Sequence, residues 1–354
     1  MKTLYKYILF SATFISLFSC EKFDISDNAD TFFHVKINNT ELPVWVKGNT
    51  ESKKLVIYIN GGPGLTSIDV AHADMFGWSE ILEKKFGMVY YDQRGCGNSQ
   101  GNIQEESLTI AQFVDDLFAI VNVLKSQYEN TSIYLMGHSF GSYIGANYLM
   151  DSVRQSKISG WVTVDGSFNF DNELQWDYKR SFLINIAKEE TSNDNDLEYW
   201  SDVLTWTEIN TVISSDDQKD EWREFIGNPG EKLIPLEEGQ LTLGQHLSID
   251  FSSSYNPFHA YLSKNQEIVN TTLNKEAEGK DIIADVSSIT IPSLFLWGRY
   301  DDIIPIEQGF DVYNNLGSVV TAKTFVIMDK SSHEPFIGEP QKFQNSIVEF
   351  LNKQ

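Results

Sequence analysis

The sequence predicts an α/β fold in which a mostly parallel sheet carries helices on both faces and is interrupted by an inserted helical cap. Three observations predict this fold. Short, nearly continuous apolar runs recur along the chain, as expected of strands that are buried on both faces. Stretches with apolar residues at three- and four-residue intervals, typical of amphipathic helices, separate several of these runs. The alternation stops at about residue 167 and resumes at about residue 289.

Most of the predicted strands lie in the first half of the chain. Residues 31–37 and 42–48 are expected to form a strand pair. Residues 54–60, 87–92 and 132–137 have the β-branched and apolar content of buried parallel strands. Three more strands are predicted at 158–165, 291–298 and 323–328, and helices at 108–128, 141–153, 306–315 and 339–353.

These elements divide the chain into four parts. They are a signal peptide (1–19), a tether (20–30), a sheet domain (31–166 and 289–354) and a helical cap insertion (167–288). The cap is acidic, with 24 Asp and Glu residues against nine Lys and Arg residues between Asp171 and Asp285. A cleft under such a segment is expected to have a negative potential, which would attract a substrate ammonium group.

The N-terminal segment has the features of an export signal. Lys2 and Lys6 precede a largely apolar run of 13 residues, which is too short to span a bilayer but typical of a secretory signal peptide. The segment ends in LFSC, which resembles a bacterial lipobox and implies cleavage before Cys20 and lipidation of its thiol. We therefore expect an exported cell-envelope lipoprotein, held at a membrane only by its lipid anchor. A plain signal peptide followed by a chance cysteine is the alternative.

Charge and cysteine content exclude two further classes. Removal of residues 1–19 takes away two lysines and no acids, so the net charge changes from −23 to −25. Such a surface repels phosphates, and we expect no nucleic-acid partner. Cys96 is then the only cysteine besides Cys20, and we expect a small packing residue rather than half of a disulfide.

The stretch GHSFG, residues 137–141, places a serine between two glycines, after a predicted strand and before a predicted helix. This is the G-x-S-x-G pattern of a nucleophile elbow, whose tight turn needs tiny residues two positions from the serine. The turn presents the Ser139 hydroxyl at the carboxyl edge of the sheet, and it places the Phe140 amide at a helix N-terminus. We predict Ser139 as the nucleophile and Phe140 as an oxyanion-hole donor.

A serine nucleophile needs a base and a carboxylate that orients the base, and on this pattern the chain order is Ser, acid, His. His333 is the only histidine beyond the last predicted strand. The acid should follow the strand at 291–298, where Asp301 is the first choice and Asp302 the alternative. The other five histidines are expected to be structural: His34, His72, His138, His246 and His259.

The glycine-rich stretch NGGPG, residues 60–64, follows a predicted strand directly. Its backbone can cross the mouth of the site, and we expect the Gly62 amide to be the second oxyanion-hole donor. A phosphate-binding loop is the alternative, but no Lys-Ser/Thr pair follows and no G-x-G-x-x-G accompanies it.

Five motifs in this order resemble the prolyl aminopeptidase (proline iminopeptidase) branch of the α/β-hydrolases. They are NGGPG (60–64), YYDQRGCGNS (90–99), GHSFGS (137–142), GRYD (298–301) and SSHEP (331–335). The resemblance covers roughly residues 40–165 and 289–352. By motif it implies a triad of Ser139, Asp301 and His333 and an oxyanion hole of Gly62 and Phe140, with Asp92 and Arg94 as loop-bracing residues.

We therefore expect a serine hydrolase with an acyl-enzyme mechanism that cleaves an amide at the N-terminus of a small peptide. Its expected partner is a small-molecule or short-peptide substrate. The alternatives are a carboxylesterase or lactonase with the same triad, and a non-catalytic binding lipoprotein. Acyl transfer to water needs no cofactor. No HExxH, cysteine pair or close His/Asp cluster predicts a metal site. No oligomeric state is predicted.

Overall fold

The computed structural model describes residues 29–99, 103–213, 215–233 and 265–354. The predicted signal peptide, Cys20 and nearly all of the tether lie outside these residues, as do His246, His259 and the middle of the predicted cap. No helix in the described part of the chain is both long enough and apolar enough to cross a membrane.

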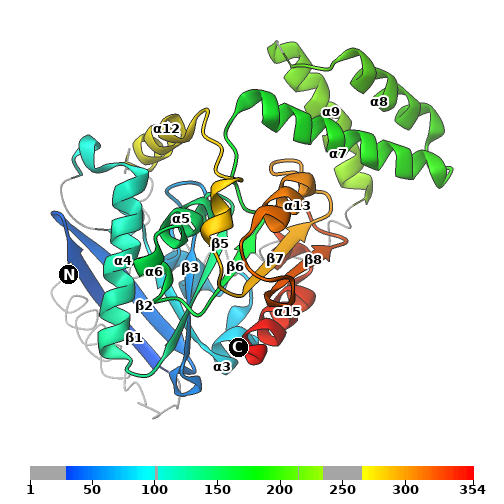
Figure 1. The fold of residues 1–354 in the computed structure, drawn as a ribbon. Helices are drawn as coiled ribbons and strands as arrows, with labels where there is room; N and C mark the ends of the chain where they lie inside the picture. Colours follow the sequence, from blue (N-terminus) through cyan, green and yellow to red (C-terminus); the bar gives the residue numbers. More distant parts are fainter. Residues whose placement is uncertain (1–28, 100–102, 214, 234–264) are drawn as a thin grey trace, which may run out of the picture.

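Eight strands of the described residues form one sheet, in the order β1-β2-β4-β3-β5-β6-β7-β8 (Figure 1). β1 pairs antiparallel with β2, and β2 with β4, whereas the remaining neighbours are parallel. The mostly parallel sheet is therefore confirmed, and each predicted strand is present. The strand bounds are β1 (Ala29–Ile37), β2 (Thr40–Gly48), β3 (Lys54–Ile59), β4 (Gly87–Tyr91), β5 (Ser132–His138), β6 (Gly160–Val164), β7 (Ser293–Gly298) and β8 (Lys323–Met328).

The central strands are apolar throughout because both faces of the sheet are covered. In β3, Leu55 and Ile57 belong to the apolar core on one face, whereas Val56 and Tyr58 belong to the core on the other. All four side chains are buried. A strand in this position leaves no face for polar residues, which explains the continuous apolar runs in the sequence.

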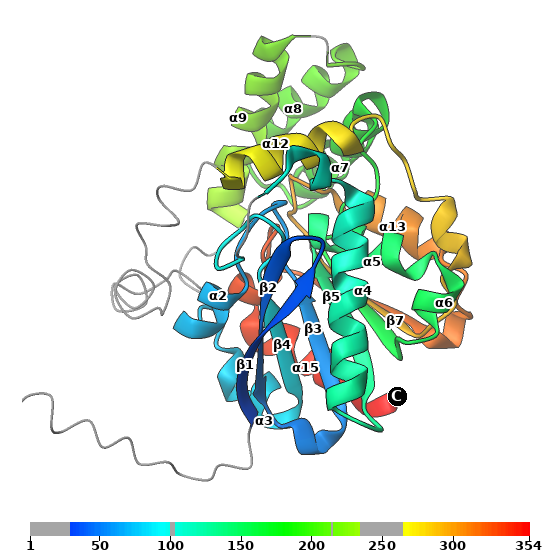
Figure 2. The ribbon, with the colours of Figure 1, turned by 90° about the vertical axis from the view of Figure 1, so that its left-hand side faces the viewer.

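Helices cover both faces, as predicted (Figure 2). One face carries α4 (Ile110–Gln127), α5 (Phe140–Leu149) and α13 (Ile306–Asn315), with the short α6 (Ser152–Gln155) after α5. The other face carries α2 (Ile68–Ala73), α3 (Leu82–Lys85), α14 (Pro335–Gly338) and α15 (Pro340–Lys353). The Thr109 hydroxyl caps α4 by accepting a hydrogen bond from the Gln112 N–H, which fixes the start of this helix.

Between β6 and β7 the described chain forms four further helices: α7 (Asn172–Ser192), α8 (Leu197–Ile209), α9 (Asp216–Leu233) and α12 (Asn265–Ala277). α7, α8 and α9 lie together beyond the sheet, whereas α12 lies over α4 and α5 (Figures 1 and 2). Trp176, Trp200 and Trp222 belong to a small apolar core that is separate from the two cores of the sheet. The chain leaves and re-enters the sheet domain side by side, because Asn169 and Asp281 form an antiparallel bridge.

A buried ion pair joins Arg94, which follows β4, to α4, and the same arginine also holds the hairpin of β1 and β2. The Arg94 guanidinium donates to both carboxylate oxygens of Asp116 on α4, at 2.9 and 2.6 Å. It also donates to the Thr40 hydroxyl at 2.7 Å and to the Asn38 carbonyl at 3.1 Å. Because both charged side chains are almost fully buried, Arg94 braces the fold, as expected from its motif.

Candidate active site

Ser139 lies on a strained turn between β5 and α5. Its φ and ψ are 52° and −123°, a conformation that costs a non-glycine residue on the order of 1–3 kcal/mol. A Cβ at Gly141 would lie 2.0 Å from the Ile59 carbonyl oxygen, and one at Gly137 would lie 2.7 Å from the Gly141 backbone. The two glycines of the motif are therefore required by close packing, as the elbow pattern predicts.

The backbone around Ser139 is held by the neighbouring strand. The Ser139 N–H donates to the Val164 carbonyl at the end of β6, at 2.9 Å, and the Ser139 carbonyl accepts from the Ser167 N–H at 3.1 Å. Phe140 begins α5, and its N–H has no hydrogen-bond partner among the described residues. An unpaired N–H beside Ser139 can donate a hydrogen bond to an oxygen of a bound molecule.

His333 is joined to Asp301. The His333 Nδ1 atom lies 2.8 Å from Asp301 Oδ2, while Asp301 Oδ1 accepts from the Ile303 and Ile304 N–H groups at 2.9 Å each. The alternative acid, Asp302, instead lies 3.5 Å from the Ser332 hydroxyl. Since a carboxylate only accepts, His333 donates through Nδ1–H, which leaves Nε2 free to accept a proton.

The environment of His333 favours its charged form. Burial lowers the pKa of His333, but the Asp301 charge and the hydrogen bond to Asp301 outweigh burial, so the pKa is raised above 6.5. Asp301 itself is fully buried. The pair therefore has the electrostatics of a base whose protonated form is stabilised by a fixed carboxylate.

A glycine brings the loops after β7 and β8 together. A Cβ at Gly298, the last residue of β7, would lie 1.9 Å from the Ser332 carbonyl oxygen. Two residues later, the Tyr300 N–H donates to the Ser331 carbonyl at 3.0 Å. This close contact sets His333 directly beside Asp301.

His138, the neighbour of Ser139, contacts the loop that carries His333. Its Nε2 atom lies 2.9 Å from the His333 carbonyl oxygen, and the two imidazole rings are 4.9 Å apart. Because a carbonyl only accepts, His138 donates through Nε2–H. Burial, with a contribution from His333, lowers the pKa of His138 to about 3, so the ring stays neutral. No hydrogen bond joins the Ser139 hydroxyl to His333 among the described residues, and His138 provides the link between the two loops.

The glycine-rich loop passes directly beside Ser139. A Cβ at Gly61 would lie 2.9 Å from the Ser139 Cβ. The Asn60 side chain fixes the loop, because it accepts from the Gly61 N–H at 2.9 Å and donates to the Thr66 carbonyl at 2.6 Å. Gly62 has a φ of 113°, and its N–H has no hydrogen-bond partner in the described part of the chain. Gly62 and Phe140 thus each supply an unpaired amide near Ser139.

Asp92 fixes the continuation of the glycine-rich loop through hydrogen bonds. Its Oδ1 accepts from the Thr66 hydroxyl and from the Ser67 and Ile68 N–H groups, at 2.7, 2.8 and 3.0 Å. Its Oδ2 accepts from the Asn98 N–H at 2.7 Å. Asp92 therefore braces the loop, in agreement with the expectation from its motif.

One buried acid was missed in the sequence. Asp165 follows β6, is fully buried, and accepts from the Gly298 N–H at 2.7 Å. Burial, and then the Asp301 charge, raise the pKa of Asp165 well above its ordinary value. The feature of the sequence that could have revealed Asp165 was a second acidic residue at the end of the strand that pairs with β7.

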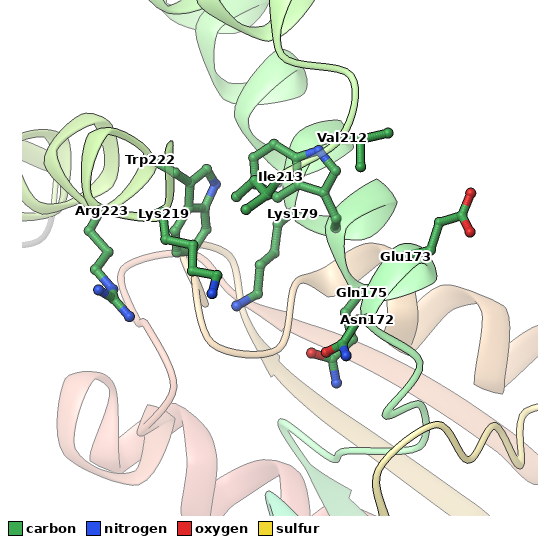
Figure 3. Close-up of a pocket in the computed structure, with 10 residues that line it drawn as sticks. Asn172, Glu173, Gln175, Lys179, Val212, Ile213, Lys219, Trp222 and Arg223 are labelled. Carbon is green, nitrogen blue, oxygen red and sulfur yellow. The ribbon is translucent and has the colours of Figure 1, made fainter. Parts of the chain in front are cut away.

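A cavity of about 590 Å³ lies between α7, α9 and the segment that joins α8 to α9 (Figure 3). Among the described lining residues are three basic side chains, Lys179, Lys219 and Arg223, and one acidic side chain, Glu173. The lining of this cavity is therefore more basic than the cap as a whole, which is acidic. Most of the acidic side chains of α7 and α9 are exposed to solvent. The net charge of the cap therefore does not predict the charge of its interior.

The described residues contain no group of three or more His, Cys, Asp or Glu side chains that could hold a metal ion. Cys96 is a free, buried cysteine, and its Sγ atom lies 3.4 Å from the Arg94 carbonyl.

Comparison with known proteins identifies the fold. A family model described as the alpha/beta hydrolase fold matches residues 54–340. The "Probable aminopeptidase YbaC" of Bacillus subtilis is 24% identical over 323 residues, which cover 88% of this chain and 93% of that protein. The crystal structure of proline iminopeptidase from Mycobacterium smegmatis superposes with a TM-score of 0.59 at 16% identity, covering 91% of this chain and 98% of the other. An esterase from Exiguobacterium antarcticum gives 0.57 at 16% identity, with coverage of 92% and 100%. The fold class and the resemblance predicted from the motifs are both confirmed.

Proposed function

Because the chain belongs to the alpha/beta hydrolase fold family, we propose that it is a serine hydrolase that cleaves the amide after the N-terminal residue of a short peptide. The observation that carries the serine chemistry is the pairing of His333 Nδ1 with Asp301 Oδ2 at 2.8 Å, in a loop that His138 ties to the elbow of Ser139. The relatives named as an aminopeptidase and a proline iminopeptidase support the choice of an amide substrate.

In this mechanism the Ser139 hydroxyl attacks the scissile carbonyl while His333 Nε2 takes its proton. Asp301 holds the Nδ1–H tautomer and stabilises the imidazolium. The resulting oxyanion accepts from the Gly62 and Phe140 amides, which have no other partner in the described structure. His333 then gives the proton to the leaving amine, and an acyl-enzyme forms on Ser139. Water releases the acid product by the same steps and restores the serine.

A carboxylesterase is the second candidate. The same groups cleave an ester, and a structurally similar protein is named as an esterase. The leaving group is chosen by the cap, which the shared fold does not define.

Ser139→Ala tests the serine chemistry. Wild type should be labelled by a fluorophosphonate and should hydrolyse an aminoacyl 4-nitroanilide or a 4-nitrophenyl ester. The variant should lose labelling and fall by several orders of magnitude in kcat. Ser332→Ala, which removes a hydroxyl next to His333, is the matched control and should still be labelled. Turnover by Ser139→Ala above about a hundredth of wild type would refute the assignment. The ratio of anilide to ester hydrolysis decides between the two substrate classes.

A further inference from the structure

The cap cavity differs in charge from the segment that forms it. The region from Asp171 to Asp285 has 24 acidic and nine basic residues, yet three of the nine basic residues and only one acidic residue are among the described lining residues. Figure 3 shows Lys179, Lys219 and Arg223 with their charged ends directed into the same space, while the Glu173 carboxylate points away from them. Arg223 is also paired with Asp220 at 2.8 Å, so its charge is largely compensated and Lys179 is the residue that matters here.

Lys179 is the central residue of this group. It extends from α7, and its ammonium lies 4.7 Å from the centre of the Trp222 ring, which favours a cation above its face. No carboxylate of the described residues forms an ion pair with Lys179 within 4.0 Å. A partly buried ammonium that contacts an aromatic ring, but no carboxylate, is suited to an anion from outside.

Lys179 also lies toward the candidate active site. Burial lowers the pKa of Lys179, while the charges of Asp302 and Asp301 raise it, so the ammonium is within electrostatic range of the acid that holds His333. α7, which carries Lys179 on the cavity wall, also contacts the loop after β7 through the ion pair of Glu189 with Arg299. A substrate whose scissile bond is at Ser139 could extend into the cavity.

We propose that the cap cavity is a substrate subsite that binds a carboxylate through Lys179. The inference rests on the proposed function and names its substrate class: short peptides or esters that carry a carboxylate away from the scissile bond. The strongly negative protein surface repels such substrates, so the subsite provides the local attraction that brings them in. An acidic subsite for a substrate ammonium would have required the opposite lining.

Two matched pairs of chromogenic esters test the subsite. In the first pair, 4-nitrophenyl valerate and mono-4-nitrophenyl glutarate differ by a carboxylate on the acyl side. In the second pair, 4-nitrophenyl acetate and 3-carboxy-4-nitrophenyl acetate differ by a carboxylate on the leaving group. After correction for their rates of spontaneous hydrolysis, the anionic member of at least one pair should have a kcat/KM at least tenfold higher, about 1.4 kcal/mol. Lys179→Gln should reduce this ratio about tenfold, and Lys179→Arg should retain most of it.

Lys188→Gln is the control. It removes one positive charge from an exposed position of the same helix, outside the cavity lining, and should leave the ratio unchanged. Equal rates on both members of both pairs, or an equal loss in Lys188→Gln, would overturn the subsite.

Binding separates this inference from the serine chemistry. N-(4-nitrophenyl)glutaramic acid should bind to Ser139→Ala by calorimetry and bind at least tenfold more weakly when Lys179→Gln is added. If Ser139→Ala retains hydrolysis but binding still depends on Lys179, the proposed mechanism fails and the subsite stands. If Ser139 is essential but binding is indifferent to Lys179, the subsite fails and the mechanism stands.

Discussion

Asp165 and Asp301 are neighbouring buried carboxyl groups, and each can be replaced by Asn. We expect Asp165→Asn to retain most of the activity and Asp301→Asn to lose it. Both are fully buried, and each follows one of two adjacent strands. Asp301 accepts three hydrogen bonds, including one from the His333 ring. Asp165 accepts one from the Gly298 N–H, and its other oxygen, Oδ2, has no hydrogen-bond partner among the described residues. Two neighbouring carboxyl groups can be joined by a hydrogen bond only if one of them carries a proton.

The pKa directions identify the protonated group. Burial and then the Asp301 charge raise the pKa of Asp165 well above its ordinary value, so we expect Asp165 to be the neutral acid and to donate to Asp301. Asp165→Asn keeps this arrangement, because the amide supplies an N–H for Asp301 and an oxygen for Gly298. We therefore expect kcat/KM within about tenfold of wild type, a loss of less than about 1.4 kcal/mol, and no change in the acidic limb of the pH profile.

Asp301→Asn removes the charge that His333 needs. Its amide N–H₂ would face Nδ1, so the ring would have to present the wrong tautomer, a change that costs about 10⁴-fold in kcat, or roughly 5.5 kcal/mol. The residual activity should also have a shifted pH profile. His333 acts as the neutral base, so the rate rises as pH increases through its pKa, which in wild type is raised above 6.5. Without the Asp301 charge, burial is the main remaining influence and lowers that pKa, so the acidic limb should move to lower pH.

The assay is kcat/KM on one 4-nitrophenyl ester from pH 4.5 to 9 for wild type and both variants, with circular dichroism to show that each is folded. If Asp165→Asn lost as much activity as Asp301→Asn, Asp165 would be acting as a charge and its assignment as a neutral acid would be wrong. An acidic limb that stayed in place in Asp301→Asn would show that Asp301 does not set the pKa of His333.

Three predictions concern stability. Asp116→Ala leaves the Arg94 guanidinium buried without a carboxylate, so the free energy of unfolding from urea titration should fall by about 3–5 kcal/mol; a loss below 1 kcal/mol would contradict the bracing role. Gly141→Ala places a Cβ 2.0 Å from a backbone oxygen, and we expect little or no folded protein on expression, whereas Gly77→Ala, which meets no atom within 4 Å, should fold despite a strained φ. Burial, together with the Asp92 charge, raises the pKa of Asp69 to about 7 in the folded protein, so its ionisation destabilises the fold increasingly as pH rises from about 4 to 7. Asp69→Asn should therefore raise Tm relative to wild type more at pH 8 than at pH 4, and an equal change at both pH values would refute this pKa.

The sequence predicted the sheet and the candidate nucleophile, acid and base because those features leave local signals. Strands buried on both faces are apolar throughout, as in β3. The elbow needs glycine at 137 and 141 because a Cβ at either position would meet backbone atoms. The choice of Asp301 over Asp302 also followed from local spacing, and the structure joins Asp301 to His333.

The features that were not predicted depend on contacts between distant segments. In the sequence, Asp165 resembles any residue at the end of a strand. The pairing of β6 with β7 brings it close to Asp301, which lies 136 positions later in the chain. The basic lining of the cap cavity was not predicted, because a charge count does not distinguish the inner side of α7 and α9 from the outer side. Side-chain direction in an inserted segment is set by its own packing around Trp176 and Trp222, which the composition does not reveal.

The contact between α12 and the glycine-rich loop bears on how this enzyme could be re-engineered. Asn270 of α12 donates to the carbonyls of Gly62 and Pro63, at 3.0 and 3.2 Å, and Glu276 of the same helix accepts from the Ile110 N–H at 2.8 Å. The helix that completes the insertion is thus bonded to the loop beside Ser139. A chimera that exchanges 167–288 for the corresponding segment of a relative would replace these bonds along with the proposed substrate subsite. Grafts that keep α12 with its native core, and exchange only α7 to α9, preserve the alignment of the loop and make the better starting point for altering selectivity.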